Sequence, residues 1–443
     1  MNNWLKKVSY TRIIALSFLV VILIGSVLLT LPVSSRDRSM TPFADAVFTA
    51  TSATCVTGLV VRDTGTYWSV FGQLVILGMI QIGGLGFMTI ISMFSIFMKR
   101  KISLSERRLL MQSAGNMRLS GMVKLVKQIV KGTAVFELAG SVLLAIRFVP
   151  KFGFARGVYY AVFHSVSAFC NAGFDLMGGF QSFTAYEGDV LVNLTLMVLI
   201  TSGGLGFLVW NEIYTKGRKF GEYSLHAKLV LVTTLFLFAV GTGGFLIFES
   251  NGNLADDPFP KKLLSAAFMS VTTRTAGFNT MDLTGLSQAG TLLAMVLMFI
   301  GGSPGSTAGG VKTTTVAVVL FAMVNMSRGR EDVTIFKKRL EDSVVKHAAV
   351  IVFVYLTGVL IAGMIMGALE TKGITEIMFE IISAAGTVGL SKGITQTLSD
   401  ASKLILIVMM YGGRIGGLSL LMVFREKAKE APVRRPTEKI LIG

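Results

Sequence analysis

The chain has 443 residues, of which 52% are hydrophobic and 15% charged, and it carries a net charge of +17. Soluble domains contain roughly 25% charged residues, so this composition excludes an ordinary soluble protein. The positive charge would suit a nucleic-acid-binding protein. However, the basic residues are confined to short loops between apolar runs, and no polar stretch is long enough to form its own core. Nucleic acid is therefore not expected as a partner, and membrane lipid is.

Apolar runs of about 20 residues, the length that crosses a bilayer, recur along the chain. Eight are expected to span the membrane: 13–32, 69–98, 133–149, 189–210, 229–248, 291–301 continuing to 316–325, 348–369 and 403–424. The segment between the two members of each pair is too short and too mixed in composition to span. Each pair therefore predicts a helix, a re-entrant pore loop and a second helix.

The predicted fold is an all-α integral membrane protein with four helix–pore loop–helix repeats around a central pore, in a pseudo-four-fold arrangement. The first repeat, with the N-terminus and a cytoplasmic loop, is expected at 1–121, and the second at 122–222. The third, with a broken second helix, is expected at 223–340, and the fourth, with a basic C-terminal tail, at 341–443.

The basic residues predict the orientation. Most of the 42 lysine and arginine residues fall in five places: the N-terminus to Arg12, 99–131, 214–228, 326–346 and 425–443. With eight spans these places share one side, which the positive-inside rule makes cytoplasmic, together with both termini. The opposite loops carry acidic residues that could concentrate cations or simply be solvated. They are Asp63, Asp175, Glu187, Asp189, Asp256, Asp257 and Asp282.

Four glycines recur about 110 residues apart, each between an amphipathic run and an apolar run. One alone would indicate a tight turn, whereas four in register suggest a ring. Glycine allows the backbone to turn its carbonyl oxygens inward, and rings of carbonyls replace the hydration shell of a monovalent cation. The C-terminus of the short helix before each stretch adds partial negative charge. The expected potassium-binding residues of this selectivity filter are Val56, Thr57, Gly58, Asn171, Ala172, Gly173, Thr275, Ala276, Gly277, Thr387, Val388 and Gly389. They include no acid, which favours potassium or sodium over calcium.

A second glycine cluster recurs in each second helix, at 83–86, 203–206, 301–305 and 412–416. Close packing through small residues explains the first two. The third is too rich in glycine to remain helical and also contains a proline, so the helix is expected to break in the membrane and form a gate. The expected gate residues are Gly302, Ser303, Pro304, Gly305, Ser306, Thr307, Ala308, Gly309, Gly310, Val311, Lys312, Thr313 and Arg414.

Two gate residues are charged. An intramembrane charge such as Arg414 is costly and by default functional. Its expected partners are carbonyls of the broken loop, and an electrostatic barrier to cations is a second possible role. The side chain of Lys312 is expected to extend to the cytoplasmic face.

Other sites are not expected. The stretch from Gly305 to Thr313 is similar to a phosphate-binding loop, but Val311 interrupts it and no strand precedes it. Cys55 and Cys170 occupy the same position in two repeats and are expected to be small buried residues rather than a disulfide. The three histidines lack ligand spacing, so no metal is expected beyond transported potassium.

These features resemble the superfamily of Trk, Ktr and plant HKT potassium transporters, from about residue 12 to 425. The chain looks most like the bacterial Ktr-type membrane subunit. The resemblance implies a homodimer in the bacterial cell membrane, with one pore in each protomer. It also implies a separate cytosolic ring of nucleotide-binding RCK subunits that bind ATP or ADP, while this chain holds no cofactor. By the same resemblance, the four glycines belong to the filter, 302–313 is the gating loop, and Arg414 stands beside it.

Two other functions are alternatives for a membrane chain of this kind, a secondary carrier and an intramembrane enzyme. A secondary carrier for another cation or small solute would need a buried ionisable site, and mid-membrane acids are few, since Glu137 and Glu212 are expected near cytoplasmic ends. An intramembrane enzyme lacks any catalytic constellation, so no catalytic residue is expected. The expected function is potassium uptake, with its sodium dependence left open.

Overall fold

Each repeat begins with a long apolar helix. The computed structural model describes residues 10–86, 89, 122–330, 332–416 and 438. Within them, four helices are long and apolar enough to cross a membrane: α1 (Tyr10–Thr30), α6 (Met122–Phe152), α10 (Leu225–Glu249) and α14 (Asp342–Leu369). Large apolar side chains such as Leu23, Val27, Phe353 and Leu360 are exposed on them. Such faces suit contact with lipid.

The helix α6 corrects one expectation. It begins at Met122 rather than near residue 133, so Glu137 lies near its middle and not at a cytoplasmic end. Gln81 donates a hydrogen bond to this carboxylate over 3.0 Å. The span was expected to start later because the sequence before residue 133 is basic. Lys124 and Lys127, which belong to that basic stretch, nevertheless lie on the helix.

A shorter helix follows in each repeat and ends deep in the protein. These helices are α2 (Phe43–Thr54), α7 (Phe154–Phe169), α11 (Phe259–Thr272) and α15 (Ile374–Gly386). Their C-terminal turns are buried, and the four glycine stretches follow directly. Cys55 and Cys170 are the C-caps of α2 and α7 and are buried free thiols, as expected. Re-entrant helices are thus present in all four repeats.

The second helix of each repeat is short: α3 (Val70–Leu85), α8 (Val190–Leu205), α12 (Gln288–Phe299) and α16 (Asp400–Ile415). Each begins at a serine or aspartate whose side chain accepts a hydrogen bond from a backbone N–H in the first turn. Three end at a glycine with positive φ: Gly86, Gly206 and Gly416.

The break at Gly206 corrects the expectation of a continuous span at 189–210. Helix α9 (Phe207–Lys216) continues after α8 at an angle of 98°. The expected break in the third repeat is present between α12 and α13 (Thr313–Ser327). The chain after Gly86 and Gly416 lies mostly outside the described residues, as do much of the 99–131 loop and nearly all of the basic tail.

Neighbouring repeats meet in chain order. The second helix of each repeat contacts the short helix of the next, in the pairs α3–α7, α8–α11, α12–α15 and α16–α2. The last pair closes the circle. The aromatic core lies around the short helices and includes the fully buried side chains of Phe48, Phe169 and Phe268.

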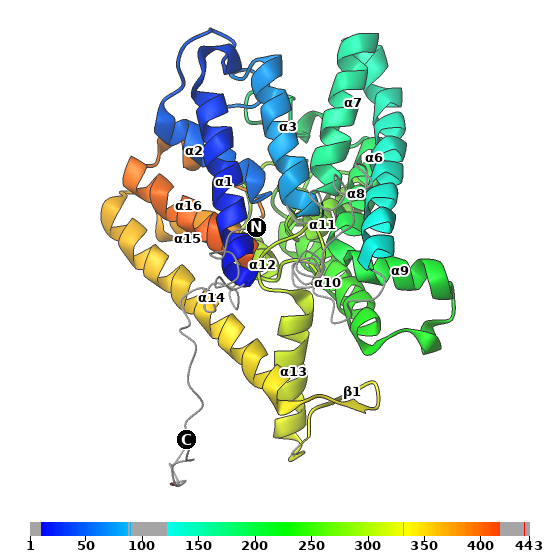
Figure 1. Ribbon diagram of the computed structural model, residues 1–443. Helices are drawn as coiled ribbons and strands as arrows, with labels where there is room; N and C mark the ends of the chain where they lie inside the picture. Colours follow the sequence, from blue (N-terminus) through cyan, green and yellow to red (C-terminus); the bar gives the residue numbers. More distant parts are fainter. Residues whose placement is uncertain (1–9, 87–88, 90–121, 331, 417–437, 439–443) are drawn as a thin grey trace.

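The remaining elements are small. Within the described part of the chain, four 3₁₀ turns occur at η1 (Pro32–Ser34), η2 (Thr184–Tyr186), η3 (Phe220–Glu222) and η4 (Thr395–Thr397). Between α13 and α14, strands β1 (Thr334–Ile335) and β2 (Lys338–Arg339) form an antiparallel hairpin. This hairpin projects beyond the helices, at the end opposite the loops that join α1 to α2 (Figure 1).

Candidate functional site

The four stretches that follow the short helices share one backbone conformation. We call 56–58, 171–173, 275–277 and 387–389 the glycine segments. The first residue of each has positive φ although it is not glycine: Val56 (58°), Asn171 (58°), Thr275 (71°) and Thr387 (52°). The glycine at the end of each segment also has positive φ, between 68° and 96°. Such backbone is strained for side-chain-bearing residues and persists only where its surroundings enforce it.

Hydroxyl groups on the short helices hold these segments. The Ser52 and Ser383 hydroxyls each accept a hydrogen bond from the segment glycine, over 3.1 Å. The Ser167 and Thr272 hydroxyls instead donate to the carbonyl oxygen of the residue after the glycine. Ser52, Ser167 and Ser383 are each followed by alanine, so a Ser-Ala pair recurs before three of the four segments and marks hydroxyls that fix the segment backbone.

The four glycines close a ring. A Cβ atom placed on Gly58 would lie 2.6 Å from the carbonyl oxygen of Ala172, and one on Gly173 would lie 2.7 Å from that of Ala276. A Cβ on Gly277 would lie 2.5 Å from Val388 O, and one on Gly389 would lie 2.1 Å from Thr57 O. Each glycine thus abuts the carbonyl before the next glycine, and the fourth returns to the first.

The ring offers neutral oxygen atoms. All twelve residues of the glycine segments are buried and none is acidic. Among the described residues, the buried hydroxyls of Thr57 and Thr387 have no hydrogen-bond partner, and no group of three or more His, Cys, Asp or Glu residues could hold a metal ion. The C-terminal ends of four helices add partial negative charge. This chemistry suits a weakly held monovalent cation better than a tightly bound metal.

A cavity of about 160 Å³ lies against the ring and is lined by all four glycines. We call it the mouth. Asp63, Asp175 and Asp282 also line it. The Asp63 carboxylate accepts hydrogen bonds from the backbone N–H groups of Thr66 and Phe180, over 2.7 and 2.8 Å. Burial, and to a lesser extent the Asp63 charge, raises the pKa of Asp175 from 3.8 to about 7.

The other expected acids do not line the mouth. Glu187 and Asp257 both pair with Lys261, over 2.8 and 2.7 Å. Asp189 caps α8 and pairs with Arg147 over 3.0 Å. The seven acids therefore include three around the mouth and three in ion pairs, while Asp256 is exposed.

The 302–313 loop lies on the other side of the glycine segments and is firmly held. Ser303 N and Thr307 N donate to the carbonyl oxygens of Gly204 and Gly203, over 3.0 and 3.2 Å. Phe207 N donates to Gly305 O over 2.9 Å, so the loop is hydrogen-bonded to the first residue of α9, at the break after Gly206. The Asn171 amide and the Thr307 hydroxyl lie 3.0 Å apart. The loop thus touches the second glycine segment directly.

The fourth repeat holds the other end of this loop. Gly310 N donates to Gly413 O over 3.2 Å. A Cβ on Gly309 would lie 2.2 Å from the Thr387 hydroxyl oxygen, so the loop also abuts the fourth glycine segment. At its base, Gly301 N donates to Val311 O and Thr313 N to Gly302 O, over 2.8 and 3.1 Å.

Arg414 joins the loop to the first repeat. Its guanidinium donates to the carbonyl oxygen of Thr307 and to those of Gly83 and Gly84. The expected loop carbonyl partner is confirmed, and the partners on α3 are new. Lys312 corrects an expectation. Its Nζ donates to Ala308 O and Gly309 O, over 2.7 and 3.3 Å, rather than extending away from the loop.

The recurring glycines of the first two second helices pack closely as expected, and Gly413 of the fourth packs in the same way. A Cβ on Gly83, Gly203 or Gly413 would lie 1.9 to 2.2 Å from a backbone carbonyl oxygen at the end of the short helix in the same repeat. Only glycine permits this approach, which brings α3, α8 and α16 against the glycine segments.

Two charged residues were missed by sequence reasoning. Arg274 lies between α11 and the third glycine segment. Its Nε has no hydrogen-bond partner, and one NH₂ group lies 3.5 Å from the Thr234 hydroxyl. Glu380 is fully buried in α15 and accepts hydrogen bonds from Ser391 and Thr395, over 2.5 and 2.7 Å. The sequence signal that could have identified both residues is a single charged residue within a stretch of small or apolar side chains.

Nearly the whole chain is similar to known cation transport proteins. Residues 5–432 match the TrkH family, described as cation transport proteins. The chain is 42% identical to the potassium/sodium uptake protein NtpJ of Enterococcus hirae, over 99% of this chain and 98% of that protein. It is 38% identical to the Ktr system potassium uptake protein B of Bacillus subtilis (strain 168), again over 99% and 98%.

A solved structure has the same fold. The potassium transporter TrkH from Vibrio parahaemolyticus aligns with a TM-score of 0.73, over 95% of this chain and 86% of that one. Sequence identity in this alignment is 18%, so the likeness concerns the fold.

Proposed function

The chain belongs to the TrkH family of cation transport proteins, and from that premise we propose that it carries potassium into the cell through the ring of glycine segments. The observation that carries this proposal is the closure of the ring, in which each glycine abuts the carbonyl before the next. Backbone carbonyls gathered around one axis can replace the water around a potassium ion. Because the ring has no carboxylate, divalent cations gain little there.

The mouth faces outward in this proposal. Asp63, Asp175 and Asp282 give it a negative potential that raises the local concentration of cations. The basic segments at 214–228 and 326–346 then lie in the cytoplasm together with both termini, as the positive-inside rule requires. The protein is a multi-pass protein of the bacterial cell membrane.

The 302–313 loop and Arg414 form the gate. The loop lies against the second and fourth glycine segments, directly below the ring. Arg414 holds the loop to α3 through Thr307 O, and its positive charge also opposes a cation in the path. Opening requires the loop to leave these contacts.

Regulation comes from a partner. The described part of the chain contains no nucleotide-binding domain, and relatives are named as components of a Ktr system. A cytosolic ring of RCK-type subunits that binds ATP or ADP fits this role, with two copies of this chain forming the membrane unit. One relative is named a potassium/sodium uptake protein, so sodium dependence is part of the same proposal.

Uptake of rubidium-86 into liposomes that contain the purified chain tests the transport proposal. Potassium should compete for uptake better than sodium, and a panel of organic solutes should not compete. Uptake of an organic solute coupled to an ion gradient, without rubidium flux, would favour a secondary carrier and overturn the proposal. Assays with and without added sodium settle the sodium dependence.

A further inference from the structure

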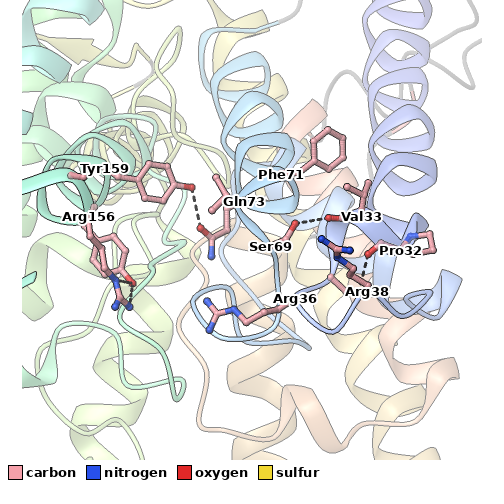
Figure 2. A pocket seen from close by; sticks show the side chains of 13 residues that line it. Pro32, Val33, Arg36, Arg38, Ser69, Phe71, Gln73, Arg156 and Tyr159 are labelled. Atoms are coloured by element: carbon pink, nitrogen blue, oxygen red, sulfur yellow. Dashed lines mark hydrogen bonds between the residues drawn. The ribbon is translucent and has the colours of Figure 1, made fainter.

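A second cavity, of about 930 Å³, lies away from the ring between the mouth-side ends of α1, α3 and α7. The described residues of its wall include Arg36, Arg38 and Arg156 and no acidic residue. Figure 2 shows these arginines around the cavity, on both sides of Gln73. Among the described residues, none of the three forms an ion pair with a carboxylate. Three positive charges therefore share one hollow without an anion.

Two of the three arginines, Arg36 and Arg156, are held in place by neutral groups. Arg36 donates to the carbonyl oxygen of Gly65 over 2.7 Å. Arg156 donates to the Tyr160 hydroxyl over 2.8 Å, and its guanidinium lies over that ring. These bonds use part of each guanidinium, which has five N–H donors, and leave donors free for an anion.

The start of α7 adds to the positive potential. A helix N-terminus carries partial positive charge and favours an acidic residue. This one has no acid in its first turn and no side-chain cap, and Arg156 lies there instead. That placement costs free energy unless an anion binds nearby.

The floor of the cavity is rigid. The Tyr159 hydroxyl donates to Gln73 Oε1 over 3.0 Å, which links α7 to α3 (Figure 2). Gln73 Nε2 donates to the carbonyl oxygens of Thr64 and Trp68, each over 3.1 Å. The cavity is therefore a preformed space between the first two repeats.

The rim is apolar. Val33, Val70 and Phe71 line the cavity and are exposed. Arginines beside exposed apolar side chains at the end of membrane helices match the boundary of a bilayer, where phosphate groups lie above acyl chains. A soluble anion would use the arginines but not the apolar rim.

We propose that this cavity binds the headgroup of an anionic phospholipid from the leaflet that the mouth faces. The phosphate diester lies among Arg36, Arg38 and Arg156, and the acyl chains follow Val33, Val70 and Phe71. Arginine suits phosphate because its planar group donates two parallel hydrogen bonds. The bound lipid joins the first repeat to the second. This proposal is independent of the ion that the protein carries.

Native mass spectrometry of the full chain tests the proposal, with phosphatidylglycerol and phosphatidylcholine of equal chain length as probes. The chain should bind phosphatidylglycerol about tenfold more tightly, because the choline group of phosphatidylcholine brings a positive charge next to the three arginines. The double variant Arg38→Gln/Arg156→Gln should lose this preference. The matched control Lys262→Gln/Lys372→Gln removes two charges elsewhere on the mouth side and should keep it.

Three results would overturn the proposal. The first is equal binding of both lipids by the unaltered chain. The second is displacement of phosphatidylglycerol by glycerol phosphate at equal concentration, which would indicate a site for a soluble anion. The third is loss of the dimer by the double variant in lipid-free detergent, which would show that a second copy fills the cavity. If the double variant does not fold, Arg38→Gln alone replaces it, because the Arg38 side chain is exposed, and it should weaken phosphatidylglycerol binding severalfold.

Discussion

Gly58 and Gly277 combine two constraints that other residues cannot meet. Each has positive φ, and each faces a carbonyl oxygen of the next segment at a distance that excludes a Cβ atom. Replacing either with serine should push the ring carbonyls apart, with strain of about 1–3 kcal/mol. We expect the preference for potassium over sodium to fall about tenfold, measured by competition against rubidium uptake.

Gly188→Ser is the matched control for this prediction. Gly188 has open space around its Cα and ordinary φ, so serine should have no effect there. Unchanged potassium preference and unchanged growth at low potassium in both Gly58→Ser and Gly277→Ser would contradict the assignment of these residues to the filter.

Asp175 should make uptake depend on pH near neutrality. Its pKa is raised to about 7 by burial, so the carboxyl is neutral below that pH and charged above it. As pH rises from 6 to 8, the mouth gains negative charge, and uptake at low potassium should increase severalfold. The free energy of unfolding changes in the opposite direction. Because the pKa of Asp175 is higher in the folded protein than in the unfolded chain, the folded protein becomes less stable as the pH rises from the unfolded pKa to about 7.

The variant Asp175→Asn isolates this effect. It should flatten the pH profile of uptake between pH 6 and 8. Asp282→Asn, in the same mouth, should reduce uptake at every pH and keep the slope. A profile that stays steep in Asp175→Asn would assign the titration to another group.

At the scale of elements, the 302–313 loop is more ordered than its composition suggests. Glycine and hydroxyl residues predict a break in the helix, and the break is present. Sequence patterns do not reveal where the loop's backbone hydrogen bonds go, because the partners lie in other repeats, at Gly203, Gly204 and Gly413. The bend at Gly206 was missed because the glycines at 203–206 were interpreted as close packing within one span, and the loop that docks there lies in another repeat.

The short helices and glycine segments were predicted well because each is encoded locally. A repeated glycine after an amphipathic run indicates a position and a backbone conformation, whereas the supporting hydroxyls of the short helices were not predicted. Arg274 and Glu380 were missed because their significance depends on burial, which a local pattern of small residues does not report.

Deleting residues 304–308 should open the gate. This deletion removes the contacts with Gly203, the Asn171 amide and Arg414, and it keeps the base bonds between Gly301 and Val311 and between Gly302 and Thr313. We expect rubidium flux without a regulator to rise about tenfold, which corresponds to about 1.4 kcal/mol.

Two point variants should raise basal flux less than the deletion does. Arg414→Gln should raise basal flux less and lower thermal stability, because it leaves buried carbonyls unsatisfied at about 1–3 kcal/mol each. Lys312→Gln, which removes bonds within the loop only, should have the smaller effect. A deletion variant that folds but conducts no more than the intact chain would mean that the gate lies elsewhere.

At the scale of the whole molecule, the gate is connected to the surface opposite the mouth. Helix α13 begins at the last residue of the 302–313 loop and leads to the β1–β2 hairpin. Ile335 of the hairpin is buried against Leu229, Val318 and Ala348, so the hairpin is anchored to α10, α13 and α14. A partner that moves this hairpin would move α13 and thereby the loop.

The exposed basic residues of the hairpin should dock the regulatory ring. Lys337 and Lys338 are exposed, and neither forms an ion pair among the described residues. Lys337→Glu/Lys338→Glu should weaken co-purification with an RCK-type regulator about tenfold and abolish the response of rubidium flux to ATP or ADP, because opposed charges become like charges. Lys262→Glu/Lys372→Glu, a charge reversal on the mouth side, should leave both readouts unchanged. Full nucleotide-responsive transport by this chain alone would show that no such partner is required.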